Sequence, residues 1–309
     1  MKLPLLLTVA FLAPLSQSVA DTFGSGTNAF TLEFASIGDA GNAADGSGYG
    51  SVAYDFRVST TEVSESVLQH AVNGGLVGVA AGAWIGDQPA AFIDWFEAAA
   101  FVNFLNTDRG LAPAYDLSWD GNNWSMNLWS SADAWQLGGE NLYRHKDAFY
   151  FLPSENEWYK AAYYQGGGTN AGYWDYPTQE NTAPTAVASG VLAGTAVYDG
   201  QSEPAGVLNN GGLSAYGNRG MCGNAAEWTE SAWDGLNNSS SEDRTVRGGD
   251  WFGEFDQLAS SSRDINAPLY ESDFIGFRVA SVPEPSTVAL ILLAGVAARL
   301  WHWRLRRDR

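Results

Sequence analysis

The chain has 309 residues, of which 16 are Lys or Arg and 35 are Asp or Glu, so its formal net charge at pH 7 is −19. Such an acidic surface repels nucleic acid and anionic lipid, which excludes nucleic-acid binding as a function class. The single cysteine, Cys222, rules out an intramolecular disulfide, and 35 glycines with 13 tryptophans are typical of a loop-rich fold with aromatic clusters.

The N-terminus has the three parts of a secretory signal peptide. Lys2 precedes an apolar run at 3–15, and small residues at 18–20 form a cleavage site. We therefore predict a signal peptide over residues 1–20 and a mature chain that begins at Asp21. The apolar run is shorter than the roughly 20 residues that span a bilayer, so a transmembrane anchor is the less favoured alternative.

Apolar and polar residues alternate in two segments, 30–34 and 52–56, which are separated by a loop rich in Gly, Asp and Asn. This pattern predicts a hairpin with a long connection. Asp39, Asn42 and Asp45 in the loop could hold a cation, but their spacing does not fit an EF-hand. A turn-forming role is favoured.

Three short helices are expected next. The first covers about 61–70. Asp94 followed by Glu97, and Ser154 followed by Glu157, have the spacing of two capping boxes that begin the second and third helices. Short strands are expected at 149–152 and 277–279. We predict one α+β domain over residues 21–281 with much irregular structure.

Five segments, taken together and in order, carry a family resemblance: 93–105, 151–162, 223–229, 246–251 and 276–280. They are similar to the signature blocks of the formylglycine-generating enzyme (sulfatase-modifying factor) family, and the resemblance spans residues 28–281. It implies a formylglycine-generating-enzyme-like fold related to C-type lectins. The capping box and Gly248-Gly249 have structural roles, and Arg278 is expected to pair with a buried carboxylate or with backbone carbonyls.

The resemblance also implies two copper-binding cysteines between the Gly-Gly and Gly-Phe-Arg blocks. In this chain the stretch 251–263 has no cysteine, and the two positions fall near Phe255 and Ser260. Neither side chain can replace a thiolate on soft Cu(I), so copper and formylglycine formation by the usual route are not expected. For Cys222, a buried inert thiol is favoured over a nucleophile.

Calcium is the cofactor that the resemblance implies for structural sites. The residues that match one site are Gly223, Ala225 and Glu227, and Asn181 matches part of a second site. Oxygen ligands suit calcium in an acidic extracellular protein. Gly220 stands where an acidic or amide ligand is implied.

The groove between the Gly-Gly and Gly-Phe-Arg blocks is the candidate ligand-binding surface. Flat aromatic faces and charged groups there could contact a sugar or peptide. The candidates are Trp251, Phe252, Phe255, Asp256 and Arg263. The alternative, which we favour for the aromatic residues, is that they belong to the core.

Two functions follow from these observations. We favour a non-catalytic binding or structural module of the cell surface or extracellular matrix, with an extracellular polysaccharide or a surface protein as its partner. The alternative is a divergent enzyme that uses other residues of the same stretch, namely Asp250, Glu254, Asp256 and Arg263.

The C-terminal tail, residues 282–309, begins with Pro283-Glu284-Pro285 and continues into a short hydrophobic segment at 288–303 and a basic end. The arginines stay in the cytoplasm under the positive-inside rule, which leaves the domain outside. The tail resembles PEP-CTERM sorting signals of Gram-negative bacteria, which implies cleavage near the Pro-Glu-Pro by an exosortase-type enzyme and release to the cell surface or medium. A permanent membrane anchor is the alternative.

Overall fold

The computed structural model describes residues 18–82 and 84–283. Most of the predicted signal peptide lies outside these residues, as do Glu284, Pro285 and the hydrophobic segment of the predicted sorting tail. None of the helices in the described parts of the chain has both the length and the apolar character that are needed to cross a membrane.

A five-stranded antiparallel sheet has the strand order β1-β2-β3-β15-β8. Its strands are β1 (Val19–Phe23), β2 (Phe30–Ile37), β3 (Phe56–Ser59), β15 (Ala280–Ser281) and β8 (Tyr150–Phe151). The sheet therefore joins the two ends of the domain, because β1 and β15 belong to it. Asp21, the predicted first residue of the mature chain, is buried and pairs with Arg57 at 2.8 Å.

A second sheet has the order β13-β12-β11-β14 and carries three of the signature blocks. Its strands are β13 (Asp264–Asn266), β12 (Arg244–Arg247), β11 (Ala226–Ala232) and β14 (Ile275–Phe277). Strand β14 runs parallel to β11, whereas the other pairs are antiparallel. Three two-stranded sheets surround these layers: β4 (Asp116–Trp119) with β5 (Trp124–Asn127), β6 (Ala134–Trp135) with β7 (Asn141–His145), and β9 (Thr185–Ala186) with β10 (Thr195–Ala196).

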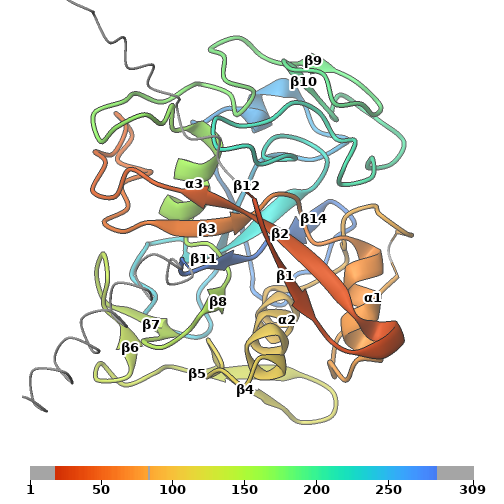
Figure 1. Cartoon of the computed structure of the whole chain (residues 1–309), viewed down its shortest axis with the longest axis vertical. Helices are drawn as coiled ribbons and strands as arrows, with labels where there is room; N and C mark the ends of the chain where they lie inside the picture. The colour runs from red at the N-terminus through yellow and green to blue at the C-terminus, as the bar shows by residue number, and fades with distance from the viewer. Residues whose placement is uncertain (1–17, 83, 284–309) are drawn as a thin grey trace, which may run out of the picture.

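The helices are α1 (Glu65–Asn73), α2 (Trp95–Asp108) and α3 (Glu155–Tyr163), with short 3-10 turns η1 (Gly26–Asn28) and η2 (Phe255–Leu258). In Figure 1, α1 lies at the right, α2 below the centre and α3 at the upper left, with strands of both sheets between α3 and the other two helices. Short helices and strands joined by long loops confirm the predicted fold class.

Both predicted capping boxes are present. The Asp94 carboxylate accepts from the backbone N–H of Glu97 at 2.7 Å, and the Ser154 hydroxyl accepts from that of Glu157 at 3.3 Å. In each box the glutamate carboxylate accepts in return from the cap residue's N–H. Such local hydrogen bonds fix where α2 and α3 begin.

Three predicted elements are displaced. The strand expected at 277–279 is β14, which covers 275–277. The first helix begins at Glu65 and not near residue 61, because Val63 is held extended by hydrogen bonds to Phe277 and Ala90. The predicted hairpin is confirmed as β2 with β3, but its second strand covers 56–59 and not 52–56. Val52 bonds instead to Gly41 and to the Asn42 side chain within the connecting loop.

Three fully buried tryptophans tie the signature blocks together in the core. The Trp228 indole N–H donates to the carbonyl of Ile93, and that of Trp95 donates to Thr229. Trp158 donates to the Glu227 carboxylate at 2.6 Å. Residues that are distant in sequence thus converge where α2, α3 and β11 meet.

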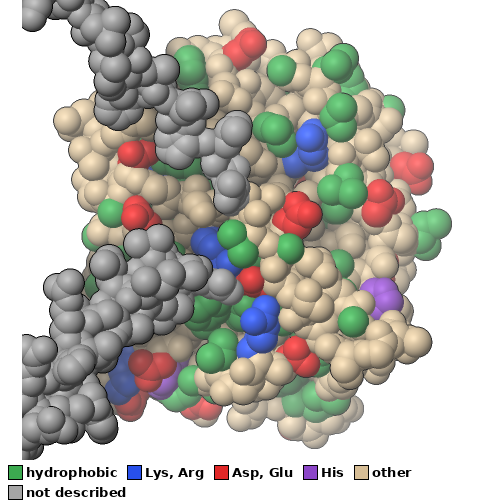
Figure 2. All heavy atoms as spheres, viewed as in Figure 1, with side chains coloured by type: hydrophobic (Ala, Val, Ile, Leu, Met, Phe, Trp, Pro, Cys, Tyr) green, Lys and Arg blue, Asp and Glu red, His purple; other side chains and the backbone are tan. Residues whose placement is uncertain are grey.

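On the face shown in Figure 2, Lys and Arg side chains are isolated spots among polar atoms. The described residues on this side therefore form no broad basic patch.

Candidate functional site in the groove beside the Gly-Gly turn

A pocket of about 280 Å³ lies between the Gly248-Gly249 turn, η2 and the segment 262–264. Gly249 has φ +67°, and a Cβ there would come within 3.1 Å of Gln257. A side chain at this position would be strained and would crowd η2. The Gly-Gly block therefore shapes the wall of the predicted groove.

The pocket contains only part of the predicted ligand-binding set. Among the described residues, its walls include Arg263 but not Trp251, Phe252, Phe255 or Asp256. Phe252 and Phe255 are 59% and 51% exposed on the adjoining loop and remain available for contact.

Trp251 belongs to the core and not to a binding face. Its side chain is 7% exposed, stacks on Phe274 at 4.9 Å and meets Trp84 edge-on at 5.8 Å. The core alternative is confirmed for Trp251, and its assignment as a ligand-binding residue stays a prediction.

Arg263 is held in place by Glu155, the first residue of α3. Its Nε and Nη2 donate to the two Glu155 oxygens at 2.7 and 2.8 Å, and its guanidinium lies 3.8 Å from the centre of the Trp233 ring. Arg247 donates to the same carboxylate at 2.8 Å. Bidentate pairing makes Arg263 a rigid wall of the pocket.

Sequence reasoning did not assign Glu155, Arg247 or Trp233 to the site. Glu155 and Arg247 each lie within a signature block. An acidic residue in one block and a basic residue in another were the signal from which their ion pair could have been predicted. Trp233 follows β11 and carries no motif of its own.

Asp250 lines the pocket and shapes the next turn. Its Oδ1 accepts from the N–H groups of Phe252 and Gly253 at 2.9 and 2.8 Å. Burial raises its pKa above the usual range, the two N–H groups lower it, and the carboxylates of Asp273 and Asp264 raise it further. Of the residues considered for a divergent enzyme, only Asp250 and Arg263 line this pocket, while Glu254 and Asp256 are exposed elsewhere on the loop.

The copper chemistry of the family does not fit these residues. Phe255 begins η2 and Ser260 follows it, so a phenyl ring and a hydroxyl occupy the implied thiolate positions. Cys222 is buried, and burial together with the Glu62 carboxylate raises the pKa of its thiol to about 12. A thiol with such a pKa is protonated near neutral pH and is a poor ligand and nucleophile.

The Glu227 carboxylate, predicted as a calcium ligand, has other partners. Arg278 donates to its two oxygens at 2.5 Å each, and the side chains of both residues are fully buried. This pairing confirms the expectation for Arg278. The oxygens of Glu227 are engaged by a guanidinium and an indole, and its role as a calcium ligand stays a prediction.

The other residues of the implied calcium sites make no hydrogen bond to this ion pair in the described part of the chain. Gly223 turns at φ +71°, and its N–H donates to Gly248. Ala225 is buried next to it, and Asn181 is exposed and accepts from the N–H of Asp175 at 3.0 Å. Calcium binding at Gly223, Ala225 and Asn181 stays a prediction.

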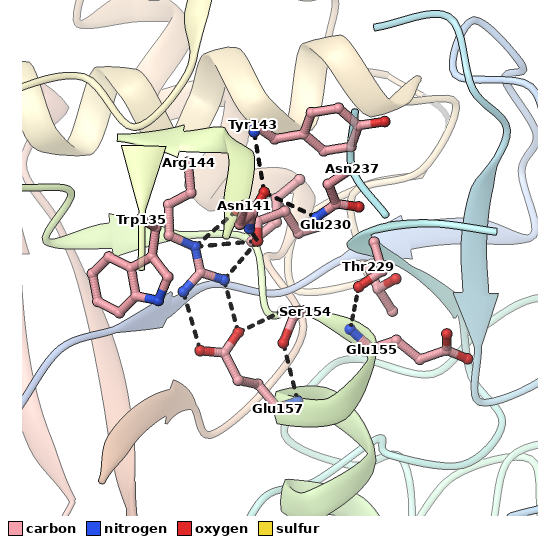
Figure 3. Close-up of polar contacts among 12 residues, drawn as sticks. Trp135, Asn141, Tyr143, Arg144, Ser154, Glu155, Glu157, Thr229, Glu230 and Asn237 are labelled. Carbon is pink, nitrogen blue, oxygen red and sulfur yellow. Dashed lines mark hydrogen bonds and ion pairs between the residues drawn. The ribbon is translucent and has the colours of Figure 1, made fainter. Parts of the chain in front are cut away.

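A second pocket, of about 200 Å³, is lined in part by Arg144 and Glu157. These two residues and Glu230 form a buried charge cluster, whose contacts are drawn in Figure 3. Arg144 of β7 donates to Glu157 at 2.8 Å and to Glu230 at 2.7 Å. Arg144 holds the pKa of Glu157 below its usual value despite burial, whereas burial and the neighbouring carboxylate raise that of Glu230. Of this cluster, the sequence singled out Glu157 alone, as part of a capping box, and did not indicate its pairing with Arg144. The three members all have partners, which indicates a structural role.

The fold is that of a formylglycine-generating-enzyme-like domain of the C-type-lectin-like class. Its features are packed short helices, a parallel β11–β14 pair and ion pairs between signature blocks. Residues 51–282 match the model of the sulfatase-modifying factor enzyme 1-like domain, and the chain belongs to this family. The comparison with curated proteins found no match.

Several solved structures share the fold. Variable protein 1 of Treponema denticola is 21% identical with a TM-score of 0.56, over 86% of this chain and 99% of that one. CarF is also 21% identical with a TM-score of 0.56, over 82% and 99%. PvdO from Pseudomonas aeruginosa is 18% identical with a TM-score of 0.52, over 85% and 98%. At these identities the likeness shows the fold alone.

Proposed function

We propose that the protein is an exported binding module of the cell surface or extracellular matrix that does not form formylglycine. The observation that carries this proposal is the replacement of the copper thiolates by Phe255 and Ser260 in a chain whose one cysteine is buried. The fold and the groove are retained without the groups that activate oxygen in the family.

The ligand class proposed for the groove is a neutral carbohydrate of an extracellular polysaccharide. The pocket is lined by Arg247 and Arg263, which are both paired with Glu155, and by Asp250 and Asp264, so residues of both charges contribute to its walls. Gln257 and Ser262 add an amide and a hydroxyl. Such mixed donors and acceptors suit sugar hydroxyls, and the exposed rings of Phe252 and Phe255 offer flat apolar faces nearby.

A glycan array with the purified protein tests this ligand class. We expect retention of a restricted set of neutral glycans and at least a tenfold weaker affinity in the double variant Ser262→Ala, Asp264→Ala, which trims two pocket walls. The matched control is Asp147→Ala, an exposed aspartate outside the pocket. Binding that survives in the groove variant, or an array without any retained glycan, would contradict the assignment.

Export and sorting are a separate part of the proposal. The signal-peptide pattern at 1–20 and the Pro-Glu-Pro tail support translocation, followed by cleavage by an exosortase-type enzyme. Intact-mass spectrometry of protein released from the cell surface should give an N-terminus at Asp21 and a C-terminus between Pro283 and Thr287. A released chain that still ends at Arg309 would defeat the processing step.

A further inference from the structure

A third pocket, of about 370 Å³, is lined by residues of β2, of the segment 60–61 and of the segment 208–219. Ser18 also lines it, and this residue would leave the protein with the predicted signal peptide. The other walls lie after Asp21 and remain in the mature chain. No wall is shared with the groove beside the Gly-Gly turn, so the two sites are distinct.

Arg219 places a cation without an ion-pair partner in this pocket. Of the Lys and Arg residues in the described parts of the chain, all but Lys160, Arg219 and Arg244 belong to an ion pair. Lys160 and Arg244 are fully buried, whereas Arg219 is partly exposed. Among the described residues, Arg219 is therefore the cation that lacks a carboxylate partner and is still within reach of solvent.

The backbone of Arg219 is fixed from both sides. Its N–H donates to the carbonyl of Thr60 at 2.7 Å, and its carbonyl accepts from Nη2 of Arg278 at 3.0 Å. Both backbone groups are thus used within the domain. The side chain is the part of this residue that is left to form the pocket wall.

One edge of the Arg219 guanidinium is open. Nη1 donates to the carbonyl of Gly211, whereas Nε and Nη2 have no hydrogen-bond partner among residues 18–82 and 84–283. Neither atom is sealed from solvent, since the buried side-chain atoms that lack a partner belong to other residues. The N–H groups of Nε and Nη2 point in parallel, and this edge matches the two oxygens of a carboxylate.

Two other arginines of the protein hold carboxylates through the same edge. Arg263 donates from Nε and Nη2 to the two oxygens of Glu155, at 2.7 and 2.8 Å. Arg278 donates to the oxygens of Glu227 through the same two atoms. The equivalent edge of Arg219 has no such partner in the described chain, which leaves it available to a carboxylate from outside.

Apolar side chains form another part of the pocket. Leu208 and Leu213 are 63% and 40% exposed, and Leu213 is paired with Arg219 in a β-bridge. The hydroxyl of Tyr216, a further wall residue, donates to Asp39 at 3.0 Å, which restrains the ring. Covering the exposed leucines with an aliphatic chain would remove apolar surface from water and favour binding.

We propose that this pocket binds a small monocarboxylate that carries an aliphatic chain. The carboxylate would accept from Nε and Nη2 of Arg219, and the chain would lie against Leu208 and Leu213. Glu33, the one acidic residue in the walls, is exposed and forms no ion pair in the described part of the chain. Because the protein carries a formal net charge of −19, its surface as a whole repels anions, so saturable binding of one requires a local site.

Isothermal titration with n-hexanoate, and with n-hexanol as a neutral probe of matched shape, tests the proposal on the purified protein at pH 7. We expect saturable binding of hexanoate, at least tenfold weaker binding of the alcohol, and at least a tenfold loss of hexanoate affinity in Arg219→Gln. Lys146→Gln, which removes an exposed cation outside the pocket, should leave the affinity unchanged. No saturable binding of hexanoate, equal binding of anion and alcohol, or full affinity in Arg219→Gln would overturn the proposal.

A second measurement needs no variant at Arg219. The Nε–H signal of Arg219 can be followed by NMR in the wild-type protein with and without saturating n-hexanoate. A carboxylate that accepts from Nε should shift this signal, whereas n-hexanol should not. An unchanged signal in the presence of hexanoate would refute the contact, whatever the glycan array shows for the other groove.

Discussion

Three arginines, Arg144, Arg244 and Arg278, are among the largest fully buried side chains of the protein. Each is stabilised differently. Arg144 lies between two carboxylates, and Arg278 pairs with Glu227 and backbone carbonyls. Arg244 lies over two aromatic rings, at 4.4 and 4.3 Å from their centres. Because a buried charge is costly without its partner, these contacts should dominate the response to mutation.

Replacing Arg144 with Met should strongly destabilise the fold. The change leaves the Glu157 and Glu230 carboxylates together in a buried site without their cation, and such a loss costs about 3–5 kcal/mol of unfolding free energy. Urea denaturation followed by circular dichroism measures the change. The control is Lys146→Met, which removes an exposed ion pair with Asp133 and should have little effect. A similar midpoint for both variants would show that the buried cluster is not required for stability.

At the scale of elements, sequence analysis succeeded where the determinants are local. The boxes at Asp94–Glu97 and Ser154–Glu157 predicted where α2 and α3 begin. In each box the two residues that bond to each other are only three positions apart, so the sequence shows both. It failed for the start of α1, where Val63 is held extended by residues from a distant strand. A local pattern contains no information about such a tertiary hydrogen bond.

The candidate site shows the same division. The Gly-Gly block lines the pocket, as its place in the order of the blocks suggested, whereas no residue of the Gly-Phe-Arg block does. The contacts that bury Trp251 could not be predicted, because they involve Trp84 and Phe274 from other parts of the chain. The Arg144 cluster was also hidden, since it joins residues 13 and 86 positions apart in sequence.

The start of α2 should make stability depend on pH. Burial, and then the Asp94 carboxylate, raise the pKa of Glu97 from 4.5 to about 7. The folded state therefore binds a proton more tightly than the unfolded chain, and stability contributed by the neutral acid is lost as pH rises from about 4.5 to 7. Ionised Glu97 thus weakens the fold above pH 7.

Glu97→Gln should remove this penalty while its side-chain oxygen still accepts from the Asp94 N–H. We expect the variant to match the wild type at pH 4 and to be more stable at pH 8. The gain should be about 1 kcal/mol, after allowance for solvent screening of a half-buried carboxylate. Thermal or urea unfolding at both pH values measures the difference. A variant that loses stability at pH 8 would show that the charge itself supports the helix.

At the scale of the whole molecule, the five-stranded sheet joins the strands nearest the two predicted export signals. Asp21 in β1 is tied to Arg57 and to the hydroxyl of Tyr150 at 2.8 Å each, and β15 lies between β3 and β8. Both ends of the domain are therefore built into one structural layer. Val19 and Ala20 of the predicted signal peptide pair with Phe34 and Glu33 in β2, so cleavage after Ala20 would shorten β1 to the residues from Asp21 onward.

The central claim is that this family member binds a ligand and does not oxidise one. Metal analysis of the purified protein, combined with an oxygen-consumption assay on a cysteine-containing peptide, tests it most directly. The account predicts no stoichiometric copper or iron and no oxygen uptake above the protein-free control, whether or not calcium is bound. Stoichiometric copper or iron together with catalytic turnover of the peptide would contradict it.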